Sequence, residues 1–268
     1  LKPKRLASIG DSITEAIDAE VYGANHWASW ANGYHGFWQW LFGLSNVKSH
    51  NQRITWEFGR RGRKNFMEAE SGADSFDLPG QAAQAVAHQA TYVPWLMGQN
   101  DICQDYEEDI PTDEKFEMNA RAALTKLSTG LPSGSTIYIV GMVDVPHLYD
   151  IAKDKKALGI VDCEVLWFST LFELFPCGTV LGPFRTDADR DSMRERIIGF
   201  NTILQGLVDE FNSRDTPHHY FYTNEVFNYD FLESEVSDLD CFHPSPDGQE
   251  KLSSITWEAG DGPNFQEW

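Results

Sequence analysis

Short apolar segments alternate with longer helical segments along the chain, and this alternation limits the folds that are open to it. Strands are predicted at residues 5–9, 66–71, 91–97, 136–143 and 218–223. Helices are predicted at residues 78–90, 112–128, 187–212 and 245–257. Such alternation is typical of a parallel sheet that is covered by helices. The 268 residues contain no internal repeat and no Pro/Ser-rich linker, so we expect one α/β domain over residues 1–268.

Four blocks of small and polar residues follow predicted strands or precede the last predicted helix. In open parallel sheets, functional sites gather where strands end and loops begin. We therefore expect the four blocks to lie close together at one edge of the sheet. The blocks are Gly10-Asp11-Ser12-Ile13-Thr14, Ser71-Gly72-Ala73-Asp74, Gly98-Gln99-Asn100-Asp101 and Asp240-Cys241-Phe242-His243.

Together the blocks contain the groups that an acyl transfer needs. Ser12 offers a hydroxyl, His243 can take its proton, and Asp240 can hold the tautomer of the imidazole. Gly72 lets a substrate oxygen approach its backbone N–H, and Asn100 supplies a second amide donor to that oxygen. Each block alone is a common turn, so the order of all four along the chain is what indicates a site.

In these blocks the sequence resembles the SGNH, or GDSL, hydrolase superfamily. Gly10-Asp11-Ser12 is similar to the nucleophile block of that superfamily, and Gly72 is similar to its glycine block. Residues 98–101 resemble its G-x-N-D block and residues 240–243 its D-x-x-H block, so the resemblance covers nearly the whole chain. Three stretches also resemble phospholipase B-like enzymes and secreted bacterial GDSL lipases: Asp77-Leu78-Pro79, Asn100-Asp101-Ile102-Cys103 and Asp240-Cys241-Phe242-His243.

The resemblance implies a flavodoxin-like, three-layer α/β/α fold with a five-stranded parallel sheet. It implies that Ser12 is the nucleophile, that His243 is the general base and then the acid, and that Asp240 orients His243. It also implies an oxyanion hole formed by the backbone N–H groups of Ser12 and Gly72 and the side chain of Asn100. The superfamily typically needs no metal and no organic cofactor, so we expect neither.

Seven aromatic residues lie within residues 27–42, shortly after the first block. Their spacings of three and four indicate a helical stripe that two glycines interrupt. One interpretation is a helix packed on the core. The other is an aromatic wall beside the nucleophile that receives an acyl chain or a choline-like head group. The candidate substrate-binding residues are Asp11 and three tryptophans, Trp27, Trp30 and Trp38.

The chain has 41 acidic and 21 basic residues, for a net charge of −20. This charge excludes nucleic acid as the main partner, disfavours stable residence on an anionic membrane, and favours neutral, zwitterionic or cationic substrates. The acidic residues of 101–114 and 187–195 are expected to be solvated. Residues 60–64 form a basic island, which is either a solvated turn or a contact to a substrate phosphate.

The four cysteines are not arranged as a zinc site, because no C-x-x-C or Cys/His cluster occurs. An even number fits an oxidising compartment, so we expect a secreted or otherwise extracytoplasmic protein, with reduced buried thiols as the alternative. Three pairings are open, and a local bridge between Cys163 and Cys177 is one of them. The cysteines are Cys103, Cys163, Cys177 and Cys241.

The sequence thus predicts a serine-dependent carboxylic ester hydrolase that works through an acyl-enzyme. Its expected partner is a small-molecule ester, either a lipid, including phospholipids and lysophospholipids, or a short acyl ester, without stable membrane insertion. Alternatives are a carbohydrate O-acetyl esterase, an acyltransferase on the same fold, and a lipid- or glycan-binding module without catalysis. A monomer is favoured, whereas the acyl chain length and the alcohol stay open.

Overall fold

A computed structural model describes residues 1–172, 176–214 and 217–260 of the chain. The predicted domain extends over residues 261–268 as well, which lie outside the described residues.

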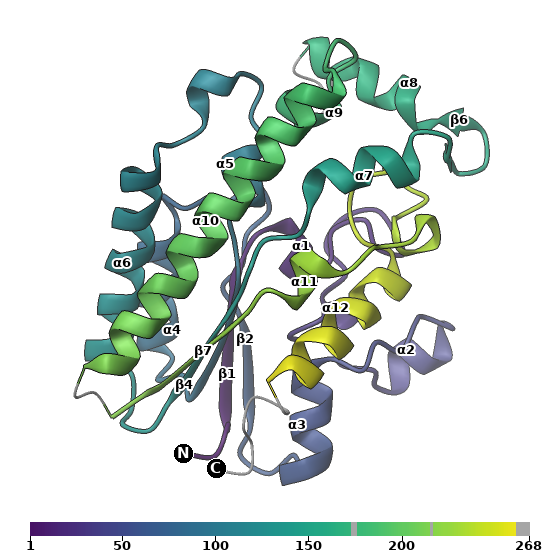
Figure 1. The fold of residues 1–268 in the computed structure, drawn as a ribbon. Coiled ribbons are helices and arrows are strands. Elements are labelled where there is room, and N and C mark those ends of the chain that lie inside the picture. The colour runs from purple at the N-terminus through teal and green to yellow at the C-terminus, as the bar shows by residue number, and fades with distance from the viewer. Residues whose placement is uncertain (173–175, 215–216, 261–268) are drawn as a thin grey trace.

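Five parallel strands form the central sheet, in the order β2-β1-β3-β4-β7 (Figure 1). All residues of the third and fourth strands of this order are buried, as expected for strands that are covered on both faces. The predicted five-stranded parallel sheet is therefore confirmed. The strands are β1 (Arg5–Gly10), β2 (Lys64–Met67), β3 (Tyr92–Leu96), β4 (Thr136–Val140) and β7 (His219–Thr223).

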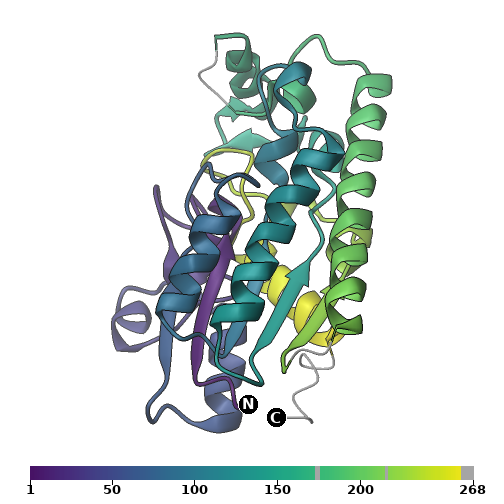
Figure 2. The ribbon, with the colours of Figure 1, turned by 90° about the vertical axis from the view of Figure 1, so that its left-hand side faces the viewer.

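Three long helices cover one face of the sheet (Figure 2). Ile9, Trp95 and Ile139 point from neighbouring strands into the core beneath them. Phe116 and Phe200 stack at 4.1 Å between ring centroids, which joins two of these helices. The three helices are α4 (Leu78–Ala87), α6 (Asp113–Gly130) and α10 (Asp187–Ser213).

Other helices cover the opposite face, where the alternate residues of the strands form a second core. At its centre lies a buried histidine, His50, whose ring nitrogens contact the Tyr92 hydroxyl at 2.7 Å and the Thr256 hydroxyl at 2.8 Å. Burial lowers the pKa of His50 to about 3, so the ring is neutral and ties the helices to the sheet. The helices on this face are α1 (Ser12–Glu15), α3 (His50–Phe58), α11 (Glu225–Asn228) and α12 (Pro246–Ala259).

A long excursion leaves the sheet after β4 and returns as α10 (Figure 1). It forms the upper part of the molecule in that view. Its elements are α7 (Val145–Ala152), β5 (Lys156–Ala157), β6 (Val161–Asp162), α8 (Cys163–Trp167), η3 (Phe168–Phe172) and α9 (Gly178–Leu181). The remaining short elements are η1 (His26–Ala28), α2 (Phe37–Leu41), α5 (Gln99–Ile102), η2 (Glu107–Asp109) and η4 (Glu233–Glu235).

Four segments differ from the sequence-based prediction by more than two residues, and one is the helix predicted at residues 78–90, which ends at Ala87. The second strand covers residues 64–67 instead of 66–71, because Lys64 pairs with Arg5 at the start of β1. The fourth strand ends at Val140 instead of 143, since the Asn201 side chain, and not a neighbouring strand, accepts from the N–H of Met142 at 2.8 Å. The aromatic residues of 27–42 do not form one helix but are divided between η1, a loop and the five-residue α2.

No helix in the described part of the chain combines the length and the apolar character needed to cross a membrane.

Candidate active site

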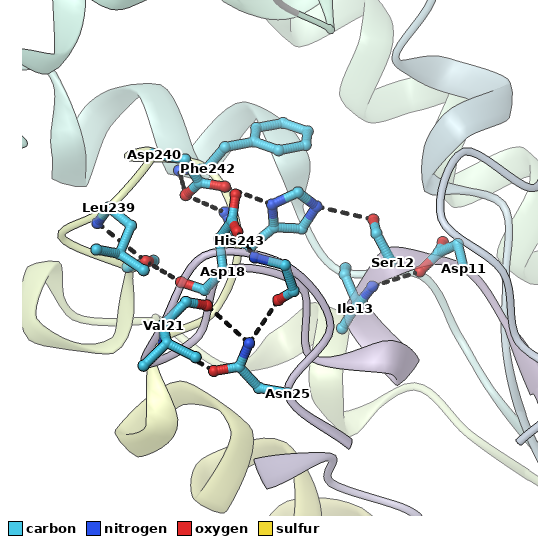
Figure 3. Close-up of polar contacts among 12 residues, drawn as sticks. Asp11, Ser12, Ile13, Asp18, Val21, Asn25, Leu239, Asp240, Phe242 and His243 are labelled. Atoms are coloured by element: carbon cyan, nitrogen blue, oxygen red, sulfur yellow. Dashed lines mark hydrogen bonds and ion pairs between the residues drawn. The ribbon is translucent and has the colours of Figure 1, made fainter. Parts of the chain in front are cut away.

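Ser12 stands at the first position of α1, directly after the strand β1. The turn between them is tight, because a Cβ atom on Gly10 would lie 2.5 Å from the carbonyl oxygen of Leu96. Asp11 caps α1, since its Oδ1 atom accepts from the N–H of Ile13 at 2.9 Å (Figure 3). The buried turn therefore presents the Ser12 hydroxyl beyond the carboxyl end of the strand.

Two buried glutamines hold the backbone on either side of Ser12. The Gln81 amide, from α4, accepts from the N–H of Gly10 at 2.7 Å and donates to its carbonyl at 2.8 Å. The Gln249 amide, from α12 on the other face, donates to the carbonyl of Ile13 at 2.7 Å and also accepts from the N–H of Trp30. Sequence reasoning missed both residues, because a glutamine in a helix carries no signal of burial.

The imidazole of His243 joins Ser12 to Asp240 (Figure 3). Its Nε2 atom lies 2.8 Å from the Ser12 Oγ atom, and its Nδ1 atom lies 2.5 Å from the Asp240 Oδ2 atom. The other carboxylate oxygen of Asp240 accepts from the backbone N–H groups of Phe242 and His243. With the Nδ1 proton donated to Asp240, the Nε2 atom can accept the proton of the hydroxyl.

A second carboxylate, that of Asp18, lies beside this hydrogen-bonded chain (Figure 3). One donor atom each from Asp18, Asp240 and His243 lie within 4.8 Å of one another, a spacing that could hold a metal ion. The polar atoms of Asp240 and His243 already bond each other and Ser12. The Asp18 carboxylate accepts from the N–H of Gly23, so we assign no metal to these residues.

The structure brings Asn100 and the turn that contains Gly72 together. Asn100 lies on α5, and its Nδ2 atom donates to the carbonyl of Ala73 at 2.8 Å. A side-chain amide has two N–H groups, so one remains for a ligand. Gly72 adopts a φ of +81°, a conformation that favours glycine. Asn100 and Ser12 both line the same cleft.

Two buried carboxyl groups lie next to these residues. Asp11 and Asp101 are both fully buried, and each has one oxygen without a hydrogen-bond partner in the described structure. Burial raises the pKa of each group from 3.8 to about 7. The expectation that the acidic residues of 101–114 are all solvated is therefore wrong at its first residue, because Asp101 turns inward and accepts from the N–H of Ser75.

Both disulfides connect these blocks to the excursion after β4. Cys103, at the end of α5, pairs with Cys177 before α9. Cys163, at the start of α8, pairs with Cys241 two residues before His243. Of the three pairings that the sequence left open, the structure thus has one in which neither bridge is local.

Further contacts join the excursion to the loop that carries His243, which comprises residues 229–245 between α11 and α12. The Lys155 ammonium lies 2.7 Å from the Asp238 carboxylate and donates to the Glu233 carbonyl at 3.0 Å. The N–H of Leu158 donates to the carbonyl of Asp238 at 2.7 Å. His147 on α7 contacts the carbonyl of Phe231 at 3.1 Å. The excursion therefore contacts this loop near its start, at residues 231 and 233, and again further along, at residue 238.

A cleft that is open in part to solvent lies at the Ser12 hydroxyl. Its walls come mainly from α7 and from the loop that carries His243, and most of its surface is apolar. The apolar lining residues are Ile13, Val143, Val145, Leu148, Ile151, Phe231, Val236, Phe242 and Pro244 together with the half-cystine Cys103. The polar lining residues are Ser12, Gln99, Asn100, Asp144, His147, Glu235 and His243.

The predicted substrate-binding residues do not line this cleft. Trp30 is fully buried in the second core, and its indole N–H donates to the Thr14 hydroxyl at 3.2 Å. The indole N–H of Trp27 donates to Glu20, and Trp38 is 63% exposed on α2. Asp11 lies beneath the turn rather than in the cleft. The aromatic wall expected beside Ser12 is instead an aliphatic wall from α7, which the sequence analysis did not identify.

A family model described as GDSL-like lipase/acylhydrolase matches residues 6–256. The chain belongs to this family. The match extends across all four blocks, and it classes the domain with ester-hydrolysing enzymes, as the blocks predict. Among curated proteins, the acyloxyacyl hydrolase of Mus musculus is 24% identical over 214 residues, which are 74% of this chain and 35% of that protein. The chain thus spans about a third of the length of this relative.

Solved structures with the same fold cover almost the entire chain. An α/β hydrolase enzyme from the metagenome of Lake Arreo, Spain, has a TM-score of 0.56 at 14% identity, over 97% of this chain and 96% of that chain. A lipase from a goat rumen metagenome has a TM-score of 0.53 at 16% identity, over 96% and 98%. A catalytic mutant of an acetylxylan esterase from Geobacillus stearothermophilus has a TM-score of 0.51 at 16% identity, over 96% and 93%. These similarities confirm the predicted α/β fold.

Proposed function

We propose that the chain is a single serine-hydrolase domain that cleaves lipid esters through an acyl-enzyme. The observation that carries the proposal is the unbroken hydrogen-bonded chain from Ser12 through His243 to Asp240, which ends at an apolar cleft. Nucleophile and base lie within hydrogen-bond reach, and a third group orients the base, as covalent acyl transfer requires. Membership of the lipase/acylhydrolase family supports the same reaction class.

In the first half of the reaction, the Ser12 Oγ atom attacks the carbonyl carbon of the ester while the Nε2 atom of His243 takes the hydroxyl proton. The Asp240 carboxylate stabilises the imidazolium that forms. The tetrahedral intermediate then collapses, and the bond to the alcohol oxygen breaks. His243 gives its proton to that oxygen, so the alcohol leaves neutral and the acyl group stays on Ser12.

Negative charge develops on the former carbonyl oxygen during this attack. We assign its stabilisation to the backbone N–H groups of Ser12 and Gly72 and to the N–H of Asn100 that Ala73 does not use. Donors of this kind are already in place when the charge develops, so the protein need not rearrange during the reaction. Removal of one donor typically costs about 10²–10³-fold in rate. In the second half, water replaces the alcohol, His243 again acts as base, and the carboxylic acid is released.

The cleft favours a fatty acyl group over acetate. Leu148 and Ile151 on α7 face Phe231 and Val236 from the loop that carries His243, and together they form an apolar wall. Each methylene buried against such a wall contributes about 0.8 kcal/mol, whereas an acetyl group would leave most of it in contact with water. The mouse relative, named for its action on acyloxyacyl groups, agrees with this substrate class.

We also propose that the protein works outside the cytoplasm. Two disulfides are compatible with an oxidising compartment, where such bridges form and persist.

A chain-length series of p-nitrophenyl esters tests the function, with Ser12→Ala as the decisive variant. We expect turnover of octanoate to exceed that of acetate, and Ser12→Ala to lower kcat by roughly 10⁴-fold or more. Ser234→Ala, which changes an exposed serine on the loop before His243, is the control. Full activity of the Ser12 variant would refute the mechanism. Activity confined to acetate would indicate a carbohydrate O-acetyl esterase, and ester products formed with an added alcohol would indicate an acyltransferase.

A further inference from the structure

The segment around α2 exposes an unusual concentration of large apolar side chains. Single exposed apolar residues are common on protein surfaces, whereas clusters mark interaction sites. These side chains also pack on one another, with Trp38 stacked on Phe42 and Phe37 in edge contact with Trp38. We call this segment, residues 37–42, the aromatic finger. Its exposed side chains are Phe37 (64%), Trp38 (63%), Trp40 (66%), Leu41 (51%) and Phe42 (71%).

The base of the aromatic finger is fixed by polar contacts. The His35 ring contacts the carbonyl of Leu44 at 3.0 Å, which closes the segment on itself. The Glu20 carboxylate accepts from the backbone N–H and the hydroxyl of Ser45, both at 2.9 Å, and from the indole N–H of Trp27. The finger projects sideways from the domain, on the same side as the loop that carries His243 (Figure 1). Its side chains are thus held in water by a structured base.

The charge of this part of the chain is opposite to that of the rest. Residues 21–56 contain no acidic residue at all. Residues 21–67 contain six basic residues and one acidic residue, for a net charge of +5, so the remainder of the chain carries −25. Two acidic residues from outside this segment lie against it, since Glu20 accepts at the base of the finger and Glu250 lies 3.8 Å from Arg53. The guanidinium of Arg60 lies 4.7 Å from the centroid of the Tyr34 ring, three residues before the finger begins. We call residues 60–64 the basic turn, and its first residue, Arg60, thus contacts the segment that leads into the finger.

We propose that the aromatic finger and the basic turn dock the enzyme on an anionic phospholipid surface. Tryptophan binds the boundary between head groups and acyl chains, because one part of its ring system is apolar and its N–H is polar. Phenylalanine and leucine beside it enter the apolar side of this boundary. Basic residues at such a surface each gain about fivefold in binding. The charge of −25 elsewhere is repelled by the same surface, which favours an approach through the finger and the basic turn.

This docking is peripheral and does not depend on the catalytic proposal. None of the residues of the finger or the basic turn lines the cleft at Ser12. Binding can therefore be measured with lipids that the enzyme cannot cleave, and hydrolysis can be measured with soluble esters that need no surface.

The experiment is cosedimentation with vesicles of diether phosphatidylglycerol and diether phosphatidylcholine, compared with vesicles of diether phosphatidylcholine alone. We expect binding to the anionic vesicles at low ionic strength. The double variant Trp40→Ser/Phe42→Ser should bind about tenfold or more weakly, because two large side chains no longer enter the interface. Arg60→Glu/Arg61→Glu should lose roughly 30-fold, with the loss largest on anionic vesicles. Phe184→Ser, an equally exposed aromatic residue outside the segment, is the control and should bind like the wild type.

Each variant is also checked for its circular dichroism and for hydrolysis of soluble p-nitrophenyl esters. Unchanged values show that a loss of binding comes from the surface and not from misfolding. Absence of wild-type binding to anionic vesicles at low salt would overturn the proposal, and so would binding that both double variants retain. Light scattering that shows a dimer, abolished by Trp40→Ser/Phe42→Ser, together with no vesicle binding, would instead make the finger an interface between copies of the chain.

Discussion

Replacement of Asp101 by asparagine tests whether burial of an acid beside the site makes the fold sensitive to pH. Asp101 is fully buried, and its pKa is raised from 3.8 to about 7, mainly by burial and further by the charges of Asp74 and Asp11. The folded chain thus holds this proton up to about pH 7, whereas the unfolded chain releases it near 3.8. The stability that the proton provides is complete below the lower value and is lost as the pH rises through about 7.

The magnitude follows from the two pKa values. A difference of about 3 pH units corresponds to roughly 4 kcal/mol between the protonated and ionised states of the folded chain. Asparagine keeps an oxygen that can accept from the N–H of Ser75 and never ionises. As the pH rises from 4 to 8, the wild type should lose on the order of 4 kcal/mol of its free energy of unfolding, and Asp101→Asn should not. The difference between the two proteins should therefore shift by that amount in favour of the variant.

The measurement is urea denaturation of both proteins at a series of pH values, analysed as the difference between the two curves. Glu108→Gln removes one negative charge from an exposed position on η2 and controls for net charge. A difference between Asp101→Asn and the wild type that stays constant from pH 4 to pH 8 would refute the reasoning. A wild type that becomes more stable relative to Asp101→Asn as the pH rises from 4 to 8 would contradict the sign.

Two further variants test how the site is held. Gln81→Met leaves the N–H of Gly10 without its partner and removes one of two donors to the Gly10 carbonyl, which keeps the N–H of Glu70 at 3.2 Å. We therefore expect a loss of about 1–3 kcal/mol in stability and a fall of about 10–100-fold in kcat. Gln84→Met, exposed on the same helix, is its control, and an unchanged kcat in the Gln81 variant would exclude a positioning role. Cys163→Ala/Cys241→Ala opens a loop with a sequence separation of 78, which should cost about 4 kcal/mol in urea denaturation and also lower kcat. A kcat equal to that of the wild type, at a temperature where both proteins are folded, would show that the bridge does not position the imidazole.

Local sequence was sufficient to predict an element wherever the element depends on residues that are close together in the chain. The strand before Ser12 and the helix after Thr112 follow from short-range patterns, and so does the cap that the Thr112 hydroxyl provides. The edge strand β2 was misplaced because its start is set by pairing with Arg5, more than fifty residues away, and not by its own composition. Pairing between distant segments leaves little trace in either segment.

The aromatic segment shows the same limit for the candidate site. The spacing of the aromatic residues predicted one helical stripe, which is wrong, because Trp30 lies outside any helix and Trp38 lies on α2. The spacing also could not show which of these side chains face inward. Trp30 fills the core, whereas Trp38 faces water. A break at Gly33 separates them, where a Cβ atom would lie 2.5 Å from the carbonyl oxygen of Ser29. Among the residues that line the cleft, the sequence predicted only those that belong to the four blocks. It did not predict the apolar wall that α7 provides.

The contacts around Ser12 have a consequence for the timing of activity during synthesis. The proposed nucleophile lies near the start of the domain, yet the imidazole that bonds it stands 231 residues later, and Gln249 follows still further along. A nascent or cleaved chain that lacks this last stretch has the serine but neither the imidazole nor the second glutamine. Ester hydrolysis at the proposed site can therefore begin only after the residues from Ser12 to Gln249 have all been made and folded.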